Sequence, residues 1–355
     1  MISIEYIILG ILLIFACIFS NKRHFTNVAF IYMIILGMMR GLEVGTDHLG
    51  YESDFYLIKT FKSMNVMRHD FEFGYVSFML LFKKFSNDYL TFASLAIPVT
   101  LWEFWRFMEA FKVNKAYSLS LFYFSGMYFA TFNVMRQMMA IGVILGFINW
   151  LLNKKYLKFG ILIIIVSLLF HKSTLISLVL IPIHYYSTKH AELPKKHIAI
   201  VAGVCFAAFF VGKEFVQNTS LAILLSIGLG DRYDGYLSGM SEGDISNLTA
   251  TMLTIYFLIW LYFKNKSKNV FISWIYFIYI ATFNIFQMLD SAAGRISYPF
   301  WVFVLIAIPK LLEELKGKIK VFFILITIVV YAALFINNYW LNNTNGVNPY
   351  IWRTL

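Results

Sequence analysis

The stretch FGILIIIVSLLFHKSTLISLVLIPI, residues 159–183, decides the fold class. It consists of two apolar runs on either side of the polar segment His171-Lys172-Ser173-Thr174. Continuous apolar runs are typical of membrane helices, because barrel strands alternate apolar and polar residues. A lipid-exposed backbone must also satisfy its hydrogen bonds within its own segment, which favours helices. The stretch therefore predicts two membrane helices joined by a charged turn.

The rest of the chain repeats this pattern. Its 355 residues are 60% hydrophobic, 19% aromatic and 14% charged, with a mean hydropathy of +0.70. This composition excludes a soluble protein and predicts an all-α, polytopic membrane helical bundle with about 12 transmembrane helices, in a single domain over residues 1–355. The predicted spans are 4–20, 26–40, 89–108, 117–133, 137–152, 159–171, 173–187, 197–212, 248–263, 270–289, 296–309 and 321–337.

One further apolar segment, Phe73–Phe82, is about half a span long and ends at Lys83-Lys84. We predict a re-entrant or interfacial helix there. If this segment does not cross the membrane, the basic clusters that follow residues 20, 110, 152, 187, 263 and 309 all lie on the same side of it. The positive-inside rule assigns that side to the cytoplasm. The net charge of +11 then reflects topology, and no nucleic-acid partner is expected.

Charged residues near the apolar spans fall mostly at the opposite, outer face. Charges close to a bilayer core are costly and usually mark a substrate or ion path. Their convergence at one depth predicts a basic site for a membrane-borne anionic ligand. These residues are Arg40, Asp47, Asp54, Arg136, His171, Lys172, Asp290 and Arg295.

The segment from Arg40 to Tyr51 reads RGLEVGTDHLGY. Thr46 or Asp47 can cap a new helix, on which Asp47, Tyr51 and Asp54 share one face by their i, i+4, i+7 spacing. Two carboxylates and a phenol near Arg40 suit sugar binding and acid–base chemistry. The alternative is that Arg40 snorkels and Asp47 only caps the helix.

A second polar segment is Asn133-Val134-Met135-Arg136-Gln137. Asn133 is predicted to cap the following helix, and a guanidinium at a helix N-terminus suits phosphate. The alternative is that Arg136 pairs with an acidic neighbour. In either case an anionic partner is expected, because an unpaired arginine here is costly.

Two further segments carry chemistry. His171 is a candidate general base or phosphate donor, and its alternative is a structural hydrogen bond. Asp290 and Arg295, in the stretch that ends at Tyr298, contact the ligand or pair with each other. Walker, HExxH, CxxC and GxSxG motifs are absent, so neither a metal nor a cofactor is expected.

Five of these stretches, in this order from Gly37 to Pro299, resemble the EpsG family of exopolysaccharide polymerases. They are Arg40–Tyr51, Glu72-Phe73-Gly74-Tyr75, Asn133–Gln137, Phe170–Ser173 and Gly294-Arg295-Ile296. This family is similar to the Wzy-type O-antigen and capsule polymerases, which are related to GT-C glycosyltransferases. The resemblance therefore implies a GT-C-like fold.

The resemblance also implies an activity: a metal-independent glycosyltransferase that joins undecaprenyl-pyrophosphate-linked oligosaccharides at the outer face of the bacterial cytoplasmic (inner) membrane. A cluster of Arg40, Arg136 and Arg295, assisted by Lys172, would stabilise the pyrophosphate leaving group, with Asp47 as the first choice of base and His171 as the second. A flippase and a chain-length regulator are candidate partners. The catalytic set is Asp47, His171, Arg136 and Arg295; the substrate-binding set is Arg40, Thr46, Tyr51, Asp54, Gln137, Lys172, Asp290 and Tyr298.

Two other classes stay open. Twelve spans are also typical of secondary transporters, including flippases for lipid-linked oligosaccharides, but those place charges near the bilayer midplane and often have repeated halves. Here the charges lie at one face, and residues 1–177 and 178–355 show no repeat. A membrane acyltransferase using His171 would need a second acidic or histidine partner near that span, and none is evident.

Overall fold

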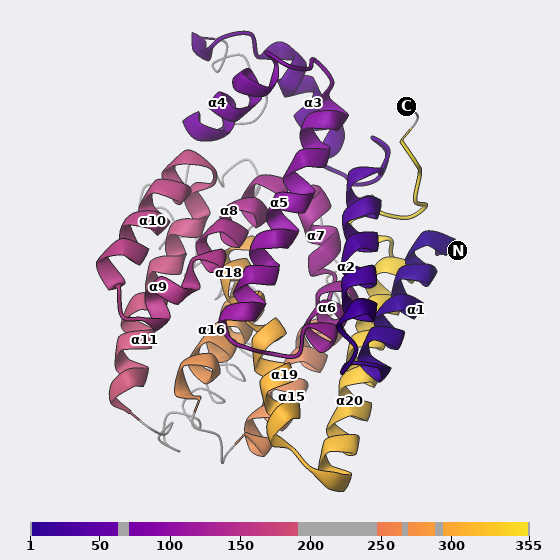
Figure 1. Cartoon of the computed structure of the whole chain (residues 1–355), viewed down its shortest axis with the longest axis vertical. Coiled ribbons are helices and arrows are strands. Elements are labelled where there is room, and N and C mark those ends of the chain that lie inside the picture. Colours follow the sequence, from indigo (N-terminus) through magenta and orange to yellow (C-terminus); the bar gives the residue numbers. More distant parts are fainter. Residues whose placement is uncertain (1, 63–70, 191–246, 265–268, 288–293, 354–355) are drawn as a thin grey trace. The chain divides into compact units, whose positions relative to one another are not determined.

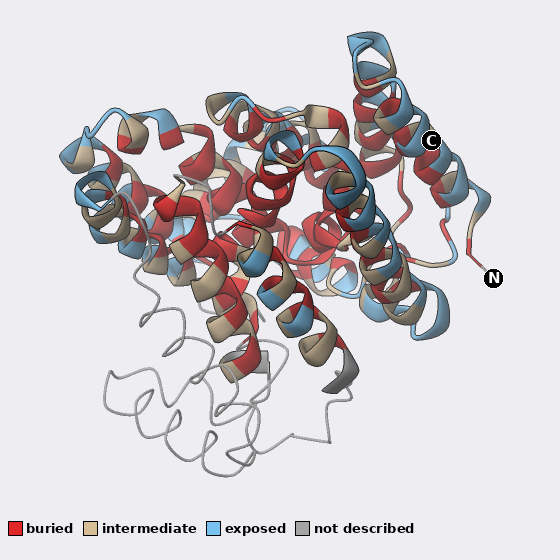
Figure 2. Cartoon of the chain, turned by 90° about the horizontal axis from the view of Figure 1, so that it is seen from below, coloured by how far each residue is buried: buried red, intermediate tan, exposed pale blue. Residues whose placement is uncertain are grey.

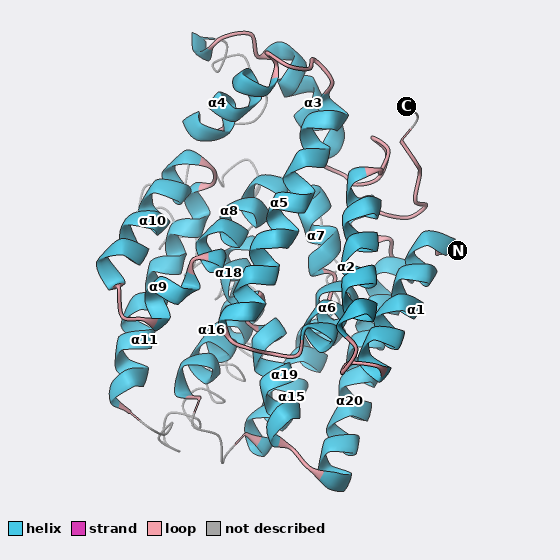
Figure 3. Cartoon of the chain, in the orientation of Figure 1, coloured by secondary structure: helices cyan, strands magenta, loops and turns pink. Residues whose placement is uncertain are grey.

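The computed structural model describes residues 2–62, 71–190, 247–264, 269–287 and 294–353. Within these residues the regular elements are helices, and the only β-type pairing is an isolated antiparallel bridge between Arg40 and Trp352 (Figure 3). The chain divides into two compact units. The first unit comprises Met1–Ile181 and Tyr331–Leu355, and the second comprises Pro182–Val330.

The first unit is built around α5, which packs along α8 (Figure 1). On one side α2 packs on α5 and α1 packs on α2 and α6, while on the other α10 packs on α8, η2 and α4. Its helices are α1 (Ile4–Ile18), α2 (Arg23–Met38), α3 (His48–Leu57), α4 (Phe73–Phe82), α5 (Tyr89–Ala110), α6 (Lys115–Phe124), α7 (Met127–Asn133), α8 (Met135–Gly146), α9 (Ile148–Leu152), α10 (Tyr156–Leu169), the 3-10 helices η2 (Lys172–Val179) and η5 (Thr344–Gly346), and the π-helix η4 (Ile336–Leu341).

The second unit is organised by α16, which packs against α15, η3, α18 and α19. Polar side chains also join α15 to α19 and α20, since the Trp260 indole donates to the Ala307 carbonyl at 3.0 Å and the Tyr256 and Thr327 hydroxyls lie 2.6 Å apart. Its helices are α11 (Leu180–Lys189), α15 (Asn247–Phe263), α16 (Val270–Gln287), the 3-10 helix η3 (Arg295–Ser297), α18 (Tyr298–Trp301), α19 (Val304–Glu314) and α20 (Gly317–Phe335).

The helices follow the predicted apolar spans. The span at 197–212 lies outside the described residues, and each of the others is helical. The half-length segment Phe73–Phe82 is α4, with the same two ends as predicted. Span 117–133 is interrupted between α6 and α7 at Gly126, whose φ of +87° favours glycine. Hydropathy does not detect such a break, because the flanking residues remain apolar.

Membrane-spanning capacity is clear for three helical stretches of the described chain: Met135–Leu152, Arg295–Glu314 and Gly317–Leu341. Shorter apolar helices include Ile4–Ile18, Tyr156–Leu169, Thr249–Phe263 and Val270–Ile285. The total of about 12 transmembrane helices stays a prediction.

Exposure separates the core helices from the outer ones. In Figure 2 buried residues line the faces where helices meet, and exposed residues lie on the outward faces. Nearly all of α8 is buried, whereas Ile11 of α1, Leu157 of α10 and Val329 of α20 are exposed. Long aliphatic side chains on outward faces favour lipid contact over water. The molecule is therefore a helical membrane protein.

Candidate functional site

The site begins at the N-terminus of α4. Glu72 precedes the helix with an extended backbone (φ −70°, ψ 149°). Gly74, the second residue of α4, lies directly against the end of α10, because a Cβ added there would be 2.5 Å from Leu169 Cβ and 2.6 Å from the Leu169 carbonyl oxygen. Only a glycine permits this approach. The close packing brings the Glu72 carboxylate beside the turn that follows α10.

The Glu72 carboxylate is the centre of this site. Its Oε2 lies 2.5 Å from Nη1 of Arg136, and both residues are buried. Its Oε1 accepts a hydrogen bond from the Lys172 backbone N–H at 3.1 Å and lies 3.8 Å from Nδ1 of His171. Three polar segments that are distant in sequence therefore meet at one carboxylate.

Aromatic rings surround the Arg136 guanidinium. Its Cζ lies 4.4 Å from the Phe71 ring centroid, 5.6 Å from that of Tyr75 and 5.7 Å from that of Tyr51. Such rings attract a cation through their quadrupoles and hold its plane in place. Arg136 Nε and the Tyr75 hydroxyl are buried without a hydrogen-bond partner among the described residues. Unsatisfied buried donors of this kind fit an acceptor-rich ligand.

Two further predicted residues join the same site. The Gln137 amide donates to the Ser173 hydroxyl at 3.1 Å, which links α8 to η2. Lys172 is the first residue of η2 and is exposed, and among the described residues its ammonium has no ion-pair partner. The site therefore combines a fixed, buried guanidinium with an exposed ammonium.

The predicted helix after Thr46 is α3, and Asp47 occupies its N-cap position. The Asp47 side chain does not cap the helix but accepts a hydrogen bond from the Thr46 hydroxyl at 3.2 Å. Tyr51 and Asp54 share the buried face of α3 with His48, whereas Asp47 is half-buried. The spacing thus places Tyr51 and Asp54 together as predicted.

The prediction that Asn133 caps the next helix is wrong, because Val134 is the N-cap residue of α8 and Asn133 ends α7. The Asn133 amide oxygen instead accepts from the Thr46 N–H at 2.7 Å, and its amide nitrogen donates to the Asn345 carbonyl at 3.0 Å. Gly45 makes this contact sterically acceptable, because its φ is +116° and a Cβ there would be 2.8 Å from Asn133 Oδ1. The side chain therefore ties the segment before α3 to α7.

Arg40 lies in a separate network, only 2% exposed. Its Nε donates to His48 Nε2 and its Nη1 to the Gly37 carbonyl, both at 2.8 Å, and its Cζ is 4.4 Å from the Phe132 ring centroid. The C-terminal segment pairs with both neighbours of Arg40, since the Gly41 N–H donates to the Ile351 carbonyl and the Arg353 N–H to the Met39 carbonyl. The guanidinium is therefore buried and does not snorkel into solvent.

His48 links Arg40 to α5. Because Nε2 accepts from Arg40, the ring proton resides on Nδ1, which donates to the Tyr89 hydroxyl at 2.8 Å. Burial, together with the charge of Arg40, lowers the pKa of His48 to about 2. The imidazole is thus neutral at physiological pH and holds α3 on α5.

The remaining predicted residues belong to the second unit. Arg295 begins η3 and Tyr298 begins α18, with the Tyr298 ring centroid 5.1 Å from that of Trp301. Asp290 lies outside the described residues, and so does its predicted pairing with Arg295. A joint role of Arg295 with Arg136 stays a prediction.

Glu72 is the central residue of this polar cluster, and the sequence analysis assigned it no role. The signal was present, because Arg136 was expected to need an anionic partner and Glu72 precedes an unusually short apolar helix. Among the described residues, no group of three or more His, Cys, Asp or Glu side chains is arranged to hold a metal ion. A metal-free reaction stays a prediction.

The fold and this site define the class: a helical membrane protein with a polar, partly cationic site where α3, α4, α8 and the turn after α10 meet. The family follows from comparison with known proteins. A model of the EpsG family matches residues 22–352, nearly the whole chain, and the chain belongs to this family. Membership indicates an exopolysaccharide polymerase. No curated protein and no solved structure matches the chain significantly.

Proposed function

We propose that this protein polymerises oligosaccharide repeat units carried on undecaprenyl pyrophosphate, at the outer face of the bacterial cytoplasmic membrane. Membership of the EpsG family supports polymer synthesis, and one structural observation supports the site. Three family-like segments, around Glu72, Arg136 and His171, meet at a single buried ion pair although up to 100 residues separate them.

In the proposed reaction, a sugar hydroxyl of one lipid-linked oligosaccharide attacks the anomeric carbon of a second. The new C–O bond forms as the bond from that carbon to the pyrophosphate oxygen breaks, and undecaprenyl pyrophosphate leaves with the bonding electron pair. The hydroxyl proton passes to a base, for which Asp47 is the first choice and His171 the second. Asp47 suits this role because it is half-buried, at the accessible start of α3.

The leaving diphosphate gains negative charge as the bond breaks, so fixed cations lower the barrier. We assign Arg136 and Lys172 to this task. The ion pair with Glu72 holds the guanidinium in one orientation, Arg136 Nε is buried without a hydrogen-bond partner among the described residues, and the Lys172 ammonium is exposed. Arg136 is therefore preorganised rather than mobile.

Arg40 receives a different role in this proposal. Because it is buried beneath the C-terminal segment and donates to His48, we treat it as a positioning residue for α3. Thr46 is exposed and suits contact with the acceptor sugar, whereas Tyr51 and Asp54 are buried and shape the inner face of α3. Gln137 holds η2 through Ser173.

The test uses purified protein in detergent micelles with a purified lipid-linked repeat unit, and polymer is measured by gel electrophoresis. Asp47→Asn should lower the initial rate by about 10²–10⁴-fold if Asp47 is the base. Lys172→Gln should lower it by about 10²-fold, because one donor to the leaving group is lost. Lys84→Gln, at another exposed lysine before α5, is the matched control and should retain the wild-type rate.

The same assay distinguishes a polymerase from a transporter. Micelles have no second compartment into which a substrate could be moved, and a transporter makes no polymer. Full turnover of Asp47→Asn would pass the base role to His171. Wild-type rates for both Lys172→Gln and Arg136→Lys, in folded protein, would remove the leaving-group assignment. Arg295→Ala is expected to abolish polymer, as the sequence predicted.

Stable binding of a flippase and a chain-length regulator is proposed as well, and affinity purification tests it.

A further inference from the structure

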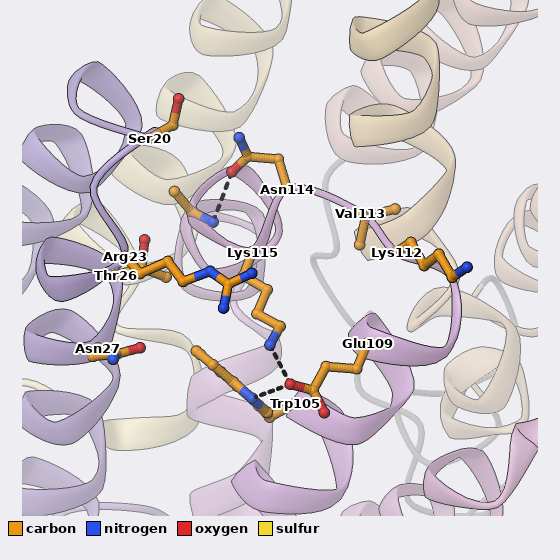
Figure 4. Close-up of a pocket in the computed structure, with 11 residues that line it drawn as sticks. Ser20, Arg23, Thr26, Asn27, Trp105, Glu109, Lys112, Val113, Asn114 and Lys115 are labelled. Carbon is orange, nitrogen blue, oxygen red and sulfur yellow. Dashed lines mark hydrogen bonds and ion pairs between the residues drawn. The ribbon is translucent and has the colours of Figure 1, made fainter.

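A polar cavity lies in the first unit, at the ends of α1, α2, α5 and α6 that are remote from α3. It has a volume of about 560 Å³ and is lined by residues of the α1–α2 turn, the start of α2, the end of α5, the α5–α6 loop and the start of α6 (Figure 4). This size is in the range of small-molecule sites. The catalytic proposal does not use this cavity.

Helices α2 and α5 both run from the cavity towards the region of α3. Helix α2 runs 16 residues from Arg23, which lines the cavity, to Met38, two residues before Arg40. Helix α5 runs 22 residues from Tyr89, which binds His48, to the cavity end. At 1.5 Å per residue these lengths are about 24 and 33 Å. The cavity is thus about one bilayer core away from α3, at the face that the basic loops predict to be cytoplasmic.

The cavity is electropositive. Three cationic side chains line it, those of Arg23, Lys112 and Lys115, against the single carboxylate of Glu109. That carboxylate is already engaged, because it forms an ion pair with Lys115 and accepts the Trp105 indole N–H at 3.0 Å. The hydrogen bond from Lys115 lowers the pKa of Glu109, which keeps it anionic at neutral pH. Pairing Glu109 with Lys115 leaves two cations over.

The charge of Arg23 also lowers the pKa of Glu109, but neither the Arg23 nor the Lys112 side chain makes a direct polar contact within the described part of the chain. Arg23 and Lys112 are exposed and form no hydrogen bond or ion pair there. Figure 4 shows the Arg23 side chain extending from α2 into the region of Lys115, with Lys112 on the α5–α6 loop. Neutral donors and acceptors complete the lining, among them Ser20, Thr26 and Asn27. Two cations with neutral donors suit a phosphate group.

Exposed apolar side chains occur close in sequence to the cavity lining. Ile18, Val28 and Trp102 are each exposed and lie within three residues of a lining residue. Aliphatic and indole side chains at that depth suit acyl chains and the lipid interface. A ligand with a phosphate head and lipid tails satisfies both the charge and the apolar surface, whereas a free phosphate satisfies only the charge.

We propose that this cavity binds the phosphate-bearing headgroup of an anionic phospholipid of the surrounding membrane, with Arg23 and Lys112 as its charge partners. Basic pockets between membrane helices are suited to such headgroups. The inference is independent of the polymerase chemistry, because none of these residues belongs to the proposed catalytic or substrate-binding set.

The test is lipid-dependent thermal stabilisation of the purified full-length chain in zwitterionic detergent. Phosphatidylglycerol should raise the unfolding temperature in a saturable manner, and phosphatidylcholine at the same mole fraction should not. The double variant Arg23→Gln/Lys112→Gln should weaken the apparent affinity by about 30-fold, since each basic residue contributes about 1 kcal/mol and 1.36 kcal/mol is a factor of ten.

A matched control has the same loss of charge elsewhere. Lys154→Gln/Lys155→Gln changes two exposed lysines of the α9–α10 turn, on the same predicted face, and Lys154 shares the positive φ of Lys112. It should retain wild-type affinity. The charge-conserving variant Arg23→Lys/Lys112→Arg should retain most of it and shows that the cavity folds.

Three outcomes would overturn the proposal. An equal loss in the control pair would show that net charge alone attracts lipid. Equal stabilisation by phosphatidylcholine would show that the headgroup charge is irrelevant. Stabilisation of the same size by inorganic phosphate alone, lost in Arg23→Gln/Lys112→Gln, would assign the cavity to a soluble phosphate instead of a lipid.

Discussion

Removal of Glu72 tests whether the buried ion pair at the start of α4 organises the site. Glu72→Ala leaves the Arg136 guanidinium buried among Phe71, Tyr51 and Tyr75 with no carboxylate, and it also removes the acceptor for the Lys172 N–H. The side chains of the pair are only 10% and 4% exposed, so water cannot replace the lost partner. The expected result is a large loss of stability.

The magnitude follows from the geometry. At the 2.5 Å separation of Arg136 Nη1 and Glu72 Oε2, an effective dielectric constant of about 20 gives an attraction of about 7 kcal/mol. Desolvation of the two ions, several kcal/mol each, offsets most of this gain. Removing one partner forfeits the attraction but keeps one desolvation cost. Glu72→Ala should therefore lower the unfolding free energy by about 3–5 kcal/mol.

A double-mutant cycle measures this coupling. Glu72→Leu, Arg136→Met and the combined variant are unfolded by detergent titration in mixed micelles, followed by intrinsic fluorescence. The combined variant should be more stable than either single variant, because no uncompensated charge remains buried. Lys310→Ala is the control, since its pair with Glu313 is partly exposed and should contribute no more than about 1 kcal/mol. Additive losses, with no coupling, would refute the reasoning.

Two further predictions concern the supports of the site. His48 has a folded-state pKa of about 2 against 6.5 in the unfolded chain, so the unfolded state binds more protons below pH 6.5 and stability should fall as pH decreases. Between pH 6.5 and 5 this loss is about 2 kcal/mol, and thermal unfolding of His48→Gln should show a flatter pH profile, whereas exposed His24→Gln should match the wild type. Gly74→Ala should destabilise by about 1–3 kcal/mol and reduce polymer yield, because its Cβ clashes with Leu169, whereas Gly10→Ala on α1 meets only ordinary contacts and should change neither. Unchanged polymer yield in Gly74→Ala would contradict the role of close α4–α10 packing.

Much of the helical fold was predictable, because lipid imposes one dominant rule on the chain. Apolar runs between charged loops locate the helices, and the short run Phe73–Phe82 was placed with both ends correct. The interruptions were not predictable in the same way. Gly126 ends α6 because its backbone adopts a left-handed conformation against Tyr339, and a hydropathy pattern does not encode that contact.

For the site, too, the sequence identified some of the residues but not the contacts between them. The residue types that carry chemistry stand out, since Arg136, His171 and Lys172 are costly beside an apolar span. The partner of Arg136 did not stand out, because a carboxylate 64 residues away at the start of a short helix resembles any surface acid. Asn133 looked like a helix cap in sequence, yet its amide binds Thr46 and Asn345. Local pattern cannot distinguish a local from a distant hydrogen bond.

By itself, the sequence determined that the chain is a helical membrane protein and which family it belongs to. These properties depend on transfer of side chains from water to lipid, and composition and order along the chain encode that transfer. Only the tertiary structure decided that Arg136 is held by Glu72 and that Arg40 is enclosed with His48. These are pairings across long stretches of chain, and their energies depend on separation and burial, which exist only once the helices pack.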